Sequence, residues 1–217
     1  MNVPLFPLPN VVFFPETFLP LEVFEVRYLR LLRDVMEGER LLLVALAREE
    51  RPAGRRPTIH QPGTIARVEV VQPLDGIRRK ILLRGLARAR ARRLREEPAG
   101  YWSGELQAIG TTLPDLQDPE VAERKARFLL TARRYGEQVL KGRYASDYLH
   151  DAIPWVTLVN RAASWLRTGT EEKQRWLAMN SLERRARAVE RRMREQIDAH
   201  AAVEVFEERR PERPGAN

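Results

Sequence analysis

Proline and glycine are distributed unevenly along the 217 residues, and this distribution limits the fold more than any other feature. Eleven of the fifteen prolines and eight of the twelve glycines fall at or before position 114. Both residue types interrupt regular structure and mark turns, so this part of the chain favours short strands. After Pro119 the chain is rich in alanine, arginine, glutamate and leucine, which favour helices. We therefore expect a β domain over residues 1–112, a helical domain over 118–200 and a polar tail over 201–217.

Several runs in the first part have strand character. We expect strands at Val11–Phe14, Arg40–Ala47 and Trp102–Ile109, which are rich in apolar, β-branched or aromatic residues. A hairpin is predicted around Asp75–Gly76, because Asp-Gly supplies the positive φ angles of a tight turn. The segment Leu86–Leu94 alternates with a period of two, which places its arginines on one face.

Helical spacing of apolar residues is found once in the first part and repeatedly in the second. Glu25–Glu37 is the early helix, with Gly38 after its last turn. Four later helices are predicted to begin near Pro119, Pro154, Thr170 and Ser181. The last of these has an apolar stripe at three- and four-residue spacing: Leu182, Ala186, Val189, Met193 and Ile197.

Several classes of chemistry are excluded by residues that the chain lacks. It has no cysteine, so disulfides, cysteine metal sites and thiol catalysis are ruled out, and its three histidines are far apart. We expect no catalytic residue, no cofactor and no metal. The longest apolar run, Leu41–Ala47, is far shorter than the ~18–20 residues of a membrane span. With no signal peptide recognisable at the start, we expect a cytoplasmic protein with no membrane partner.

Positive charge is concentrated in one part of the chain. The net charge is +8, and residues 51–110 hold 13 basic and 5 acidic side chains. Such a patch suits phosphate contacts with nucleic acid, but a solvated strand face in an arginine-rich protein is the more common reason for it. Tyr101 and Trp102, beside the patch, could stack on a base or simply pack in the core. The candidate binding residues are therefore Arg88, Arg90, Arg92, Tyr101 and Trp102.

The opening motifs resemble a known family. Pro4–Leu8 (PLFPL), Val11–Pro15 (VVFFP) and Leu19–Tyr28 (LPLEVFEVRY) are similar to the start of the amino-terminal domain of Lon proteases. The similarity continues through Gly63–Val68 and Gly85–Arg88, and covers roughly residues 1–195. The sequence differs from the family pattern at two positions, where Glu16 replaces the usual glycine and Val26 the usual proline.

This resemblance implies an α+β fold, with an N-terminal PUA-like β pseudo-barrel followed by a C-terminal α-helical bundle. In full-length Lon the region helps to bind unfolded substrates and to assemble the particle. The ATPase and peptidase modules are not recognisable here: there is no phosphate-binding G-x-x-x-x-G-K-[ST] loop, and none of the four serines lies in a glycine-rich turn. The chain therefore resembles a stand-alone bacterial Lon substrate-binding domain.

The function predicted from the sequence is the recognition of unfolded or partner polypeptides without enzymatic activity. The alternative is an RNA-binding module that uses the basic barrel face, and a homodimer through the helical region is also considered. Glu25 and Arg27 are either binding residues or a structural pair at a helix start. Phe13, Phe14 and Phe24 either line a peptide groove or fill the barrel core.

Overall fold

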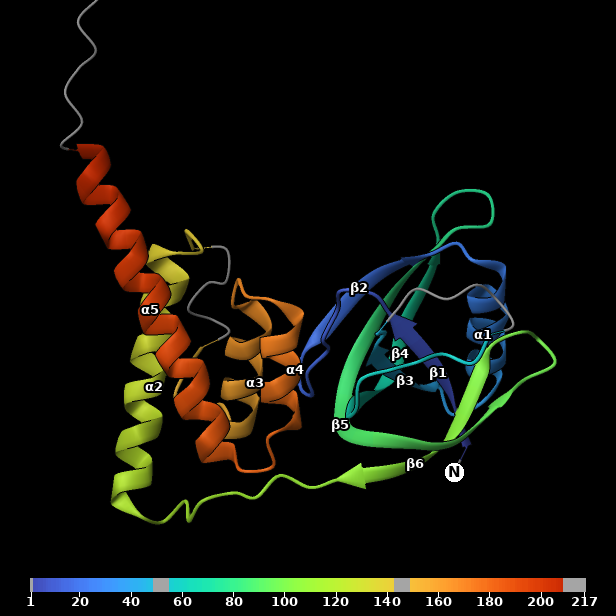
Figure 1. The fold of residues 1–217 in the computed structure, drawn as a ribbon, viewed down its shortest axis with the longest axis horizontal. Coiled ribbons are helices and arrows are strands. Elements are labelled where there is room, and N and C mark those ends of the chain that lie inside the picture. The colour runs from blue at the N-terminus through green and yellow to red at the C-terminus, as the bar shows by residue number, and fades with distance from the viewer. Residues whose placement is uncertain (1, 49–54, 143–148, 209–217) are drawn as a thin grey trace, which may run out of the picture.

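The computed structural model describes residues 2–48, 55–142 and 149–208. Six strands and one helix form the first part. In chain order they are β1 (Asn2–Leu8), β2 (Phe18–Val23), α1 (Val26–Glu37), β3 (Leu41–Leu46), β4 (Gly63–Pro73), β5 (Arg79–Glu96) and β6 (Trp102–Ile109). Four helices follow, namely α2 (Pro119–Gln138), α3 (Trp155–Trp165), α4 (Thr170–Ala178) and α5 (Leu182–Glu208). The α+β fold expected from the sequence is confirmed (Figure 1).

The sheet closes on itself through its longest strand. The order is β2-β5-β4-β3-β1-β6, and a further pairing of β5 with β6 completes a ring of five strands. One edge of β5 pairs with β4, whereas the other edge pairs with β2 over Arg79–Arg84 and then with β6 over Arg88–Glu96. β2 is therefore attached to the ring by one edge, and that place in the fold matters for the site described below.

One predicted strand is absent, and two strands that the sequence analysis did not predict are present. Val11–Phe14 is not a strand but a buried loop, in which Thr64 donates to the Phe13 carbonyl oxygen at 2.5 Å and Thr17 to that of Phe14 at 2.7 Å. These hydroxyls replace the ladder partners that a strand would need. The true strands lie on either side, at β1 and β2, where prolines occupy strand positions. Proline is tolerated there because each such strand has positions whose N–H needs no ladder partner.

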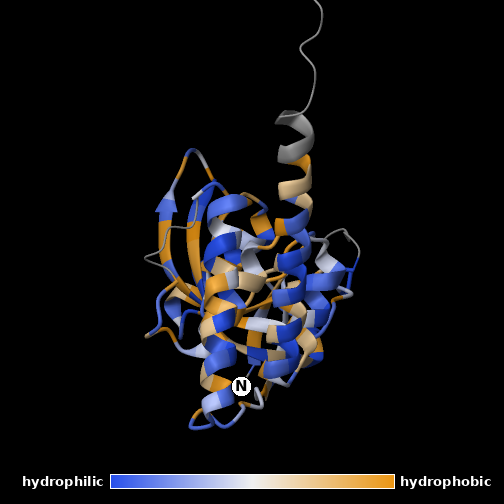
Figure 2. Ribbon diagram, turned by 90° about the vertical axis from the view of Figure 1, so that its left-hand side faces the viewer, coloured by the Kyte–Doolittle hydropathy of each residue, from blue (hydrophilic) through white to orange (hydrophobic). Residues whose placement is uncertain are grey.

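The helical part packs onto the barrel and shares a core with it. The stripe of α5 is buried throughout its predicted length, and the same apolar cluster includes Val12, Phe14 and Leu46 from the barrel side. In Figure 2 hydrophobic and hydrophilic residues alternate along the helices, as amphipathic packing requires. A second cluster fills the barrel beneath α1, with Leu31, Leu32 and Val35 of that helix.

The last helix extends past the residue at which the sequence analysis placed the start of a polar tail. α5 continues to Glu208, so the boundary expected at residue 201 falls inside a helix. Residues 200–208 contain no proline or glycine, and alanine and glutamate are good helix formers. Residues 209–217 lie outside the described part. Among the described helices, none has the length and hydropathy needed to cross a membrane.

Candidate functional site

A crevice lies between the barrel and the helical part. It has a volume of about 660 Å³ and is bordered by the segment 10–20 on the barrel side and by α3 and α4 on the other. Its apolar lining includes Val11, Phe18 and Trp165. Phe18, a large aromatic residue at the edge of the sheet, is 59% exposed.

Close backbone contacts hold the barrel wall of the crevice in place. Glu16 N–H donates to the Gly85 carbonyl oxygen at 2.9 Å, and Gly85 N–H donates to that of Thr17 at 3.0 Å. Two consecutive residues just before β2 thus oppose Gly85, in the pattern of a β-bulge. Gly85 is required at this point, because a Cβ atom there would lie 2.4 Å from the Phe14 carbonyl oxygen. Glu16 takes the left-handed conformation, with φ of 60°.

The helical wall contributes a half-buried cation. The Lys173 ammonium group donates to the Ser164 carbonyl oxygen at 2.8 Å, and burial lowers the pKa of Lys173. Among the described residues no carboxylate forms an ion pair with Lys173. A half-buried cation that touches only a neutral oxygen is suited to an incoming anionic group.

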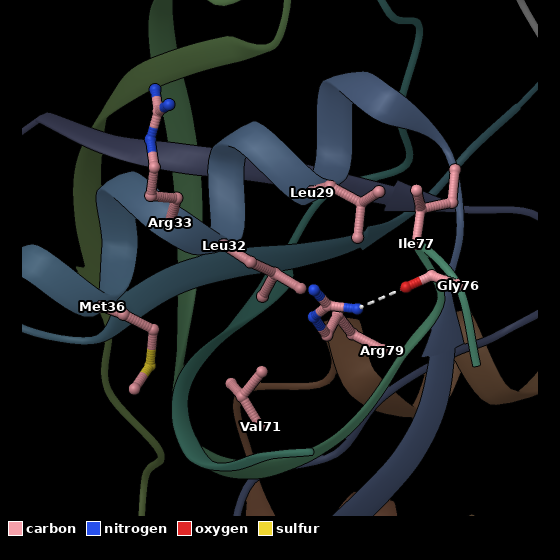
Figure 3. Close-up of a pocket in the computed structure, with 8 residues that line it drawn as sticks. All are labelled: Leu29, Leu32, Arg33, Met36, Val71, Gly76, Ile77 and Arg79. Carbon is pink, nitrogen blue, oxygen red and sulfur yellow. Dashed lines mark hydrogen bonds between the residues drawn. The ribbon is translucent and has the colours of Figure 1, made fainter. Parts of the chain in front are cut away.

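A second, smaller groove lies at the far side of the barrel. It has a volume of about 350 Å³ and separates α1 from the hairpin of β4 and β5. Figure 3 shows Leu29, Leu32 and Met36 on the α1 side, facing Val71 and Ile77. Arg79, which lies across this groove, donates to the Gly76 carbonyl oxygen at 3.3 Å.

The five residues singled out from the sequence do not form one surface. The three arginines occupy alternate positions of β5 and so share one face of the strand. Arg88 is nevertheless only 2% exposed, because the helical part covers it. Its guanidinium donates to the carbonyl oxygens of Gly110, Leu177 and Met179 at 2.6–2.9 Å. Arg88 therefore links the barrel to the helical part, and its guanidinium is covered by protein. Arg90 and Arg92 are exposed.

The aromatic pair also has structural contacts. Tyr101 is buried, and its hydroxyl donates to Asp34 Oδ2 at 3.0 Å. Burial, together with the hydrogen bond to the Asp34 carboxylate, raises the pKa of Tyr101 to about 12. Trp102 is half-buried against a small cluster that contains Leu5 and Leu43. Neither ring lines the crevice.

Two groups of residues had two possible roles from the sequence: Glu25 with Arg27, and the phenylalanines Phe13, Phe14 and Phe24. Arg27 pairs with Glu25, Nε to Oε2, at 2.9 Å, as expected of a pair at a helix start. Phe13 and Phe14 are buried, whereas Phe24 is 60% exposed. Lys173 is not among the residues predicted from the sequence, although lysine is scarce in this chain and its place in the first turn of a predicted helix was a usable signal. Within the part of the chain that the structure covers, no group of side chains is arranged to hold a metal ion.

The family is established by comparison with known proteins. The model of the ATP-dependent protease La (LON) substrate-binding domain matches residues 2–195. A Lon protease of Xanthomonas oryzae pv. oryzae is 32% identical over 134 residues, and one of Flavobacterium johnsoniae is 24% identical over 193 residues. These alignments cover 60% and 86% of this chain but only 15% and 23% of the two relatives, so the chain spans less than a quarter of their length.

Solved structures show the same fold. The N-terminal domain of Mycobacterium avium complex Lon protease superposes with a TM-score of 0.71 at 16% identity, over 89% of this chain and 98% of that one. A Lon N-terminal domain protein from Xanthomonas campestris gives a TM-score of 0.59 at 26% identity, over 85% of this chain and 94% of that one. With a family model that matches nearly its whole length, this chain belongs to the family of Lon protease substrate-binding domains.

Proposed function

We propose that this protein binds unfolded polypeptide segments in the crevice between the barrel and α3–α4, without altering them chemically. The observation that carries the proposal is the exposed Phe18 ring at an apolar crevice of about 660 Å³ in a substrate-binding domain. Exposed aromatic groups that border a concave apolar surface gain free energy when an apolar side chain of a ligand covers them.

The test is the binding of a fluorescently labelled, permanently unfolded protein, measured by anisotropy. Phe18→Ser is expected to weaken binding about tenfold or more, since burying such a ring contributes about 1.5–3 kcal/mol. Phe24→Ser is the matched control, because Phe24 is equally exposed, at 60%, but does not line the crevice. Equal losses for the two variants, or no binding by the unmodified protein, would count against the proposal.

The absence of enzymatic activity is part of this proposal. The family match covers the substrate-binding domain, and the sequence contains no phosphate-binding loop. We expect the purified protein neither to hydrolyse ATP nor to cleave an unfolded protein. Turnover of either substrate above a buffer control would contradict this.

Nucleic acid is a second candidate ligand, supported by Arg90 and Arg92. Both side chains are exposed on the outward face of β5, and neither is found in an ion pair within the described residues. If RNA binds there, affinity should fall steeply with salt, by about one released counterion per phosphate contact. Replacing both arginines with glutamine should then weaken binding and flatten the salt dependence. An affinity that does not change with salt would remove this candidate.

Two further expectations remain predictions. The cytoplasmic location can be checked by fractionating cells that produce the protein at its natural level. A homodimer through the helical region can be checked by sedimentation at several concentrations, where a mass that stays at 25.2 kDa would exclude it.

A further inference from the structure

One edge of β2 is not occupied by any of the described strands. Its residues pair in antiparallel register with β5, from Phe18 opposite Arg84 to Val23 opposite Arg79. The described strands give it no second partner, and β2 lies at the end of the strand order. In Figure 1 the start of β2 lies beside α4, and the strand then runs away from this helix along the barrel. An unpaired strand edge is a template on which another extended chain can form hydrogen bonds.

The backbone groups on this free edge can be identified from the register. Gly85 N–H donates to the Thr17 carbonyl, so Thr17 and Gly85 form a hydrogen-bonded pair. Such pairs alternate along an antiparallel ladder, which makes Leu19 and Leu21 the next residues bonded to β5. Phe18, Pro20 and Glu22 then direct their backbone groups away from β5. The position of Pro20 agrees with this, because it has no N–H to offer a ladder.

The free edge therefore presents a short and defined pattern. The N–H groups of Phe18 and Glu22 are donors, and the carbonyl groups of Phe18, Pro20 and Glu22 are acceptors. Among the described residues, none of these groups has a hydrogen-bond partner outside the strand ladder. Pro20 interrupts the row of donors, which limits indiscriminate pairing between long strand edges. The remaining donors and acceptors are sufficient to pair with an extended segment of a few residues.

The same edge forms part of the crevice wall. Phe18, Leu19 and Pro20 line the crevice, opposite Trp165 of α3 and Lys173 of α4. A segment paired with β2 would lie in the crevice with its side chains alternating between two directions. Some would meet the apolar lining, and a carboxylate on the segment could reach the Lys173 ammonium group.

We infer that unfolded polypeptides bind this protein by strand addition: an extended segment pairs with the free edge of β2, and an acidic side chain of that segment binds Lys173. This inference rests on the proposed function and specifies how the crevice would perform it. Backbone pairing tolerates many sequences, which suits a protein that must recognise unrelated unfolded chains. The charge on Lys173 adds a preference for segments that combine apolar residues with an acidic one.

Amide hydrogen exchange tests the backbone part of the inference. The probe is a short peptide of alternating valine and serine with one central aspartate, used beside the labelled unfolded protein. On binding of either, the Phe18 and Glu22 amides should exchange at least tenfold more slowly, whereas Leu19 and Leu21, already bonded to β5, should change little. If the unfolded protein binds while Phe18 and Glu22 exchange as before, strand addition is wrong and the proposed function stands. If nothing binds, both fail.

Backbone methylation of the peptide gives a second test that needs no variant of the protein. One version is methylated on every second backbone nitrogen, and the other on the remaining nitrogens. Pairing along a single edge requires that one version loses binding at least tenfold and the other does not. Equal effects of the two versions would overturn strand addition.

The charge part is tested with Lys173→Gln. This variant should bind the aspartate peptide about five- to tenfold more weakly than the unmodified protein does. For a version of the peptide with asparagine in place of aspartate, the variant and the unmodified protein should have the same affinity. Lys125→Gln is the matched control, since the Lys125 ammonium group also donates to a backbone carbonyl, that of Asp151 at 2.7 Å, but lies outside the crevice. Equal affinity of the two variants for the aspartate peptide would show that Lys173 does not bind the acidic group.

Discussion

The buried guanidinium groups of Arg88 and Arg185 donate to one shared acceptor, the Met179 carbonyl oxygen. The distances are 2.8 Å from Arg88 Nη1 and 2.6 Å from Arg185 Nη2. Met179 directly follows α4, where the helix dipole places partial negative charge. Burial lowers the pKa of both arginines, and for Arg185, where the nearby positive charge of Arg88 adds to the effect, to about 10. Neutral carbonyl and amide oxygens thus hold two buried cations where the barrel meets the helices.

Replacing Arg88 should therefore destabilise the whole fold. Arg88→Leu removes a buried guanidinium and leaves the carbonyl oxygens of Gly110, Leu177 and Met179 without this donor, and we expect the free energy of unfolding to fall by about 2–4 kcal/mol. Urea denaturation measures the change. Arg90→Leu is the control, because Arg90 is exposed on the same face of β5 and should change stability by less than about 0.5 kcal/mol. Equal stability of the two variants would refute the linking role of Arg88.

Tyr101 should make stability depend on pH in the alkaline range. Its pKa is about 12 in the folded protein and near 10 when the chain is unfolded. Between these values the unfolded state loses the phenolic proton and the folded state keeps it. The contribution of Tyr101 to the free energy of unfolding is therefore fully present below pH 10 and is lost as the pH rises towards 12. Urea denaturation at several pH values measures this. Tyr101→Phe should show a smaller fall over the same range, and an unchanged pH profile in that variant would exclude Tyr101 as the cause.

Most of the fold could be predicted from local patterns. The stripe of α5 from Leu182 to Ile197 is buried as its spacing requires, and the turn at Asp75–Gly76 joins β4 to β5. β1 and β2 were missed because proline in a run argues against a strand unless the position of the strand in the sheet is known. That position depends on pairing with β5 and β3, which are distant in the sequence.

The candidate site was much less predictable. The period of β5 correctly placed Arg88, Arg90 and Arg92 on one face, but whether a residue on that face is exposed is decided by where the helices dock. The crevice is formed by two segments more than a hundred residues apart in the sequence. Taken alone, the first is typical of core packing and the second of the start of a helix. Only the closed barrel and its contact with α3 and α4 bring Phe18 near Lys173.

Glu16 should be a site where glycine increases stability. Its φ of 60° is in the left-handed region, which costs about 1–2 kcal/mol for a residue with a Cβ atom and little for glycine. After the greater flexibility of glycine in the unfolded chain is subtracted, Glu16→Gly should raise the free energy of unfolding by about 0.5–1 kcal/mol. Asn10, with φ of 57°, is the control: asparagine tolerates this conformation, so Asn10→Gly should gain less. Thermal and urea unfolding of both variants would decide, and a loss in Glu16→Gly would contradict the expectation.

Gly85 should be intolerant of any side chain, and its replacement should damage the crevice as well as the fold. In Gly85→Ala the new Cβ would meet the Phe14 carbonyl oxygen at 2.4 Å, so the loop that contains Glu16 and leads into Phe18 of β2 must move away from β5. We expect the free energy of unfolding to fall by about 1–3 kcal/mol, as for an overpacked core, and affinity for an unfolded protein to fall with it. Gly110→Ala is the control, because a Cβ there meets nothing within 4 Å. Urea denaturation and anisotropy on the two variants separate the effects, since a Gly85→Ala protein that is less stable but binds at full strength would mean that the loop position does not matter for recognition.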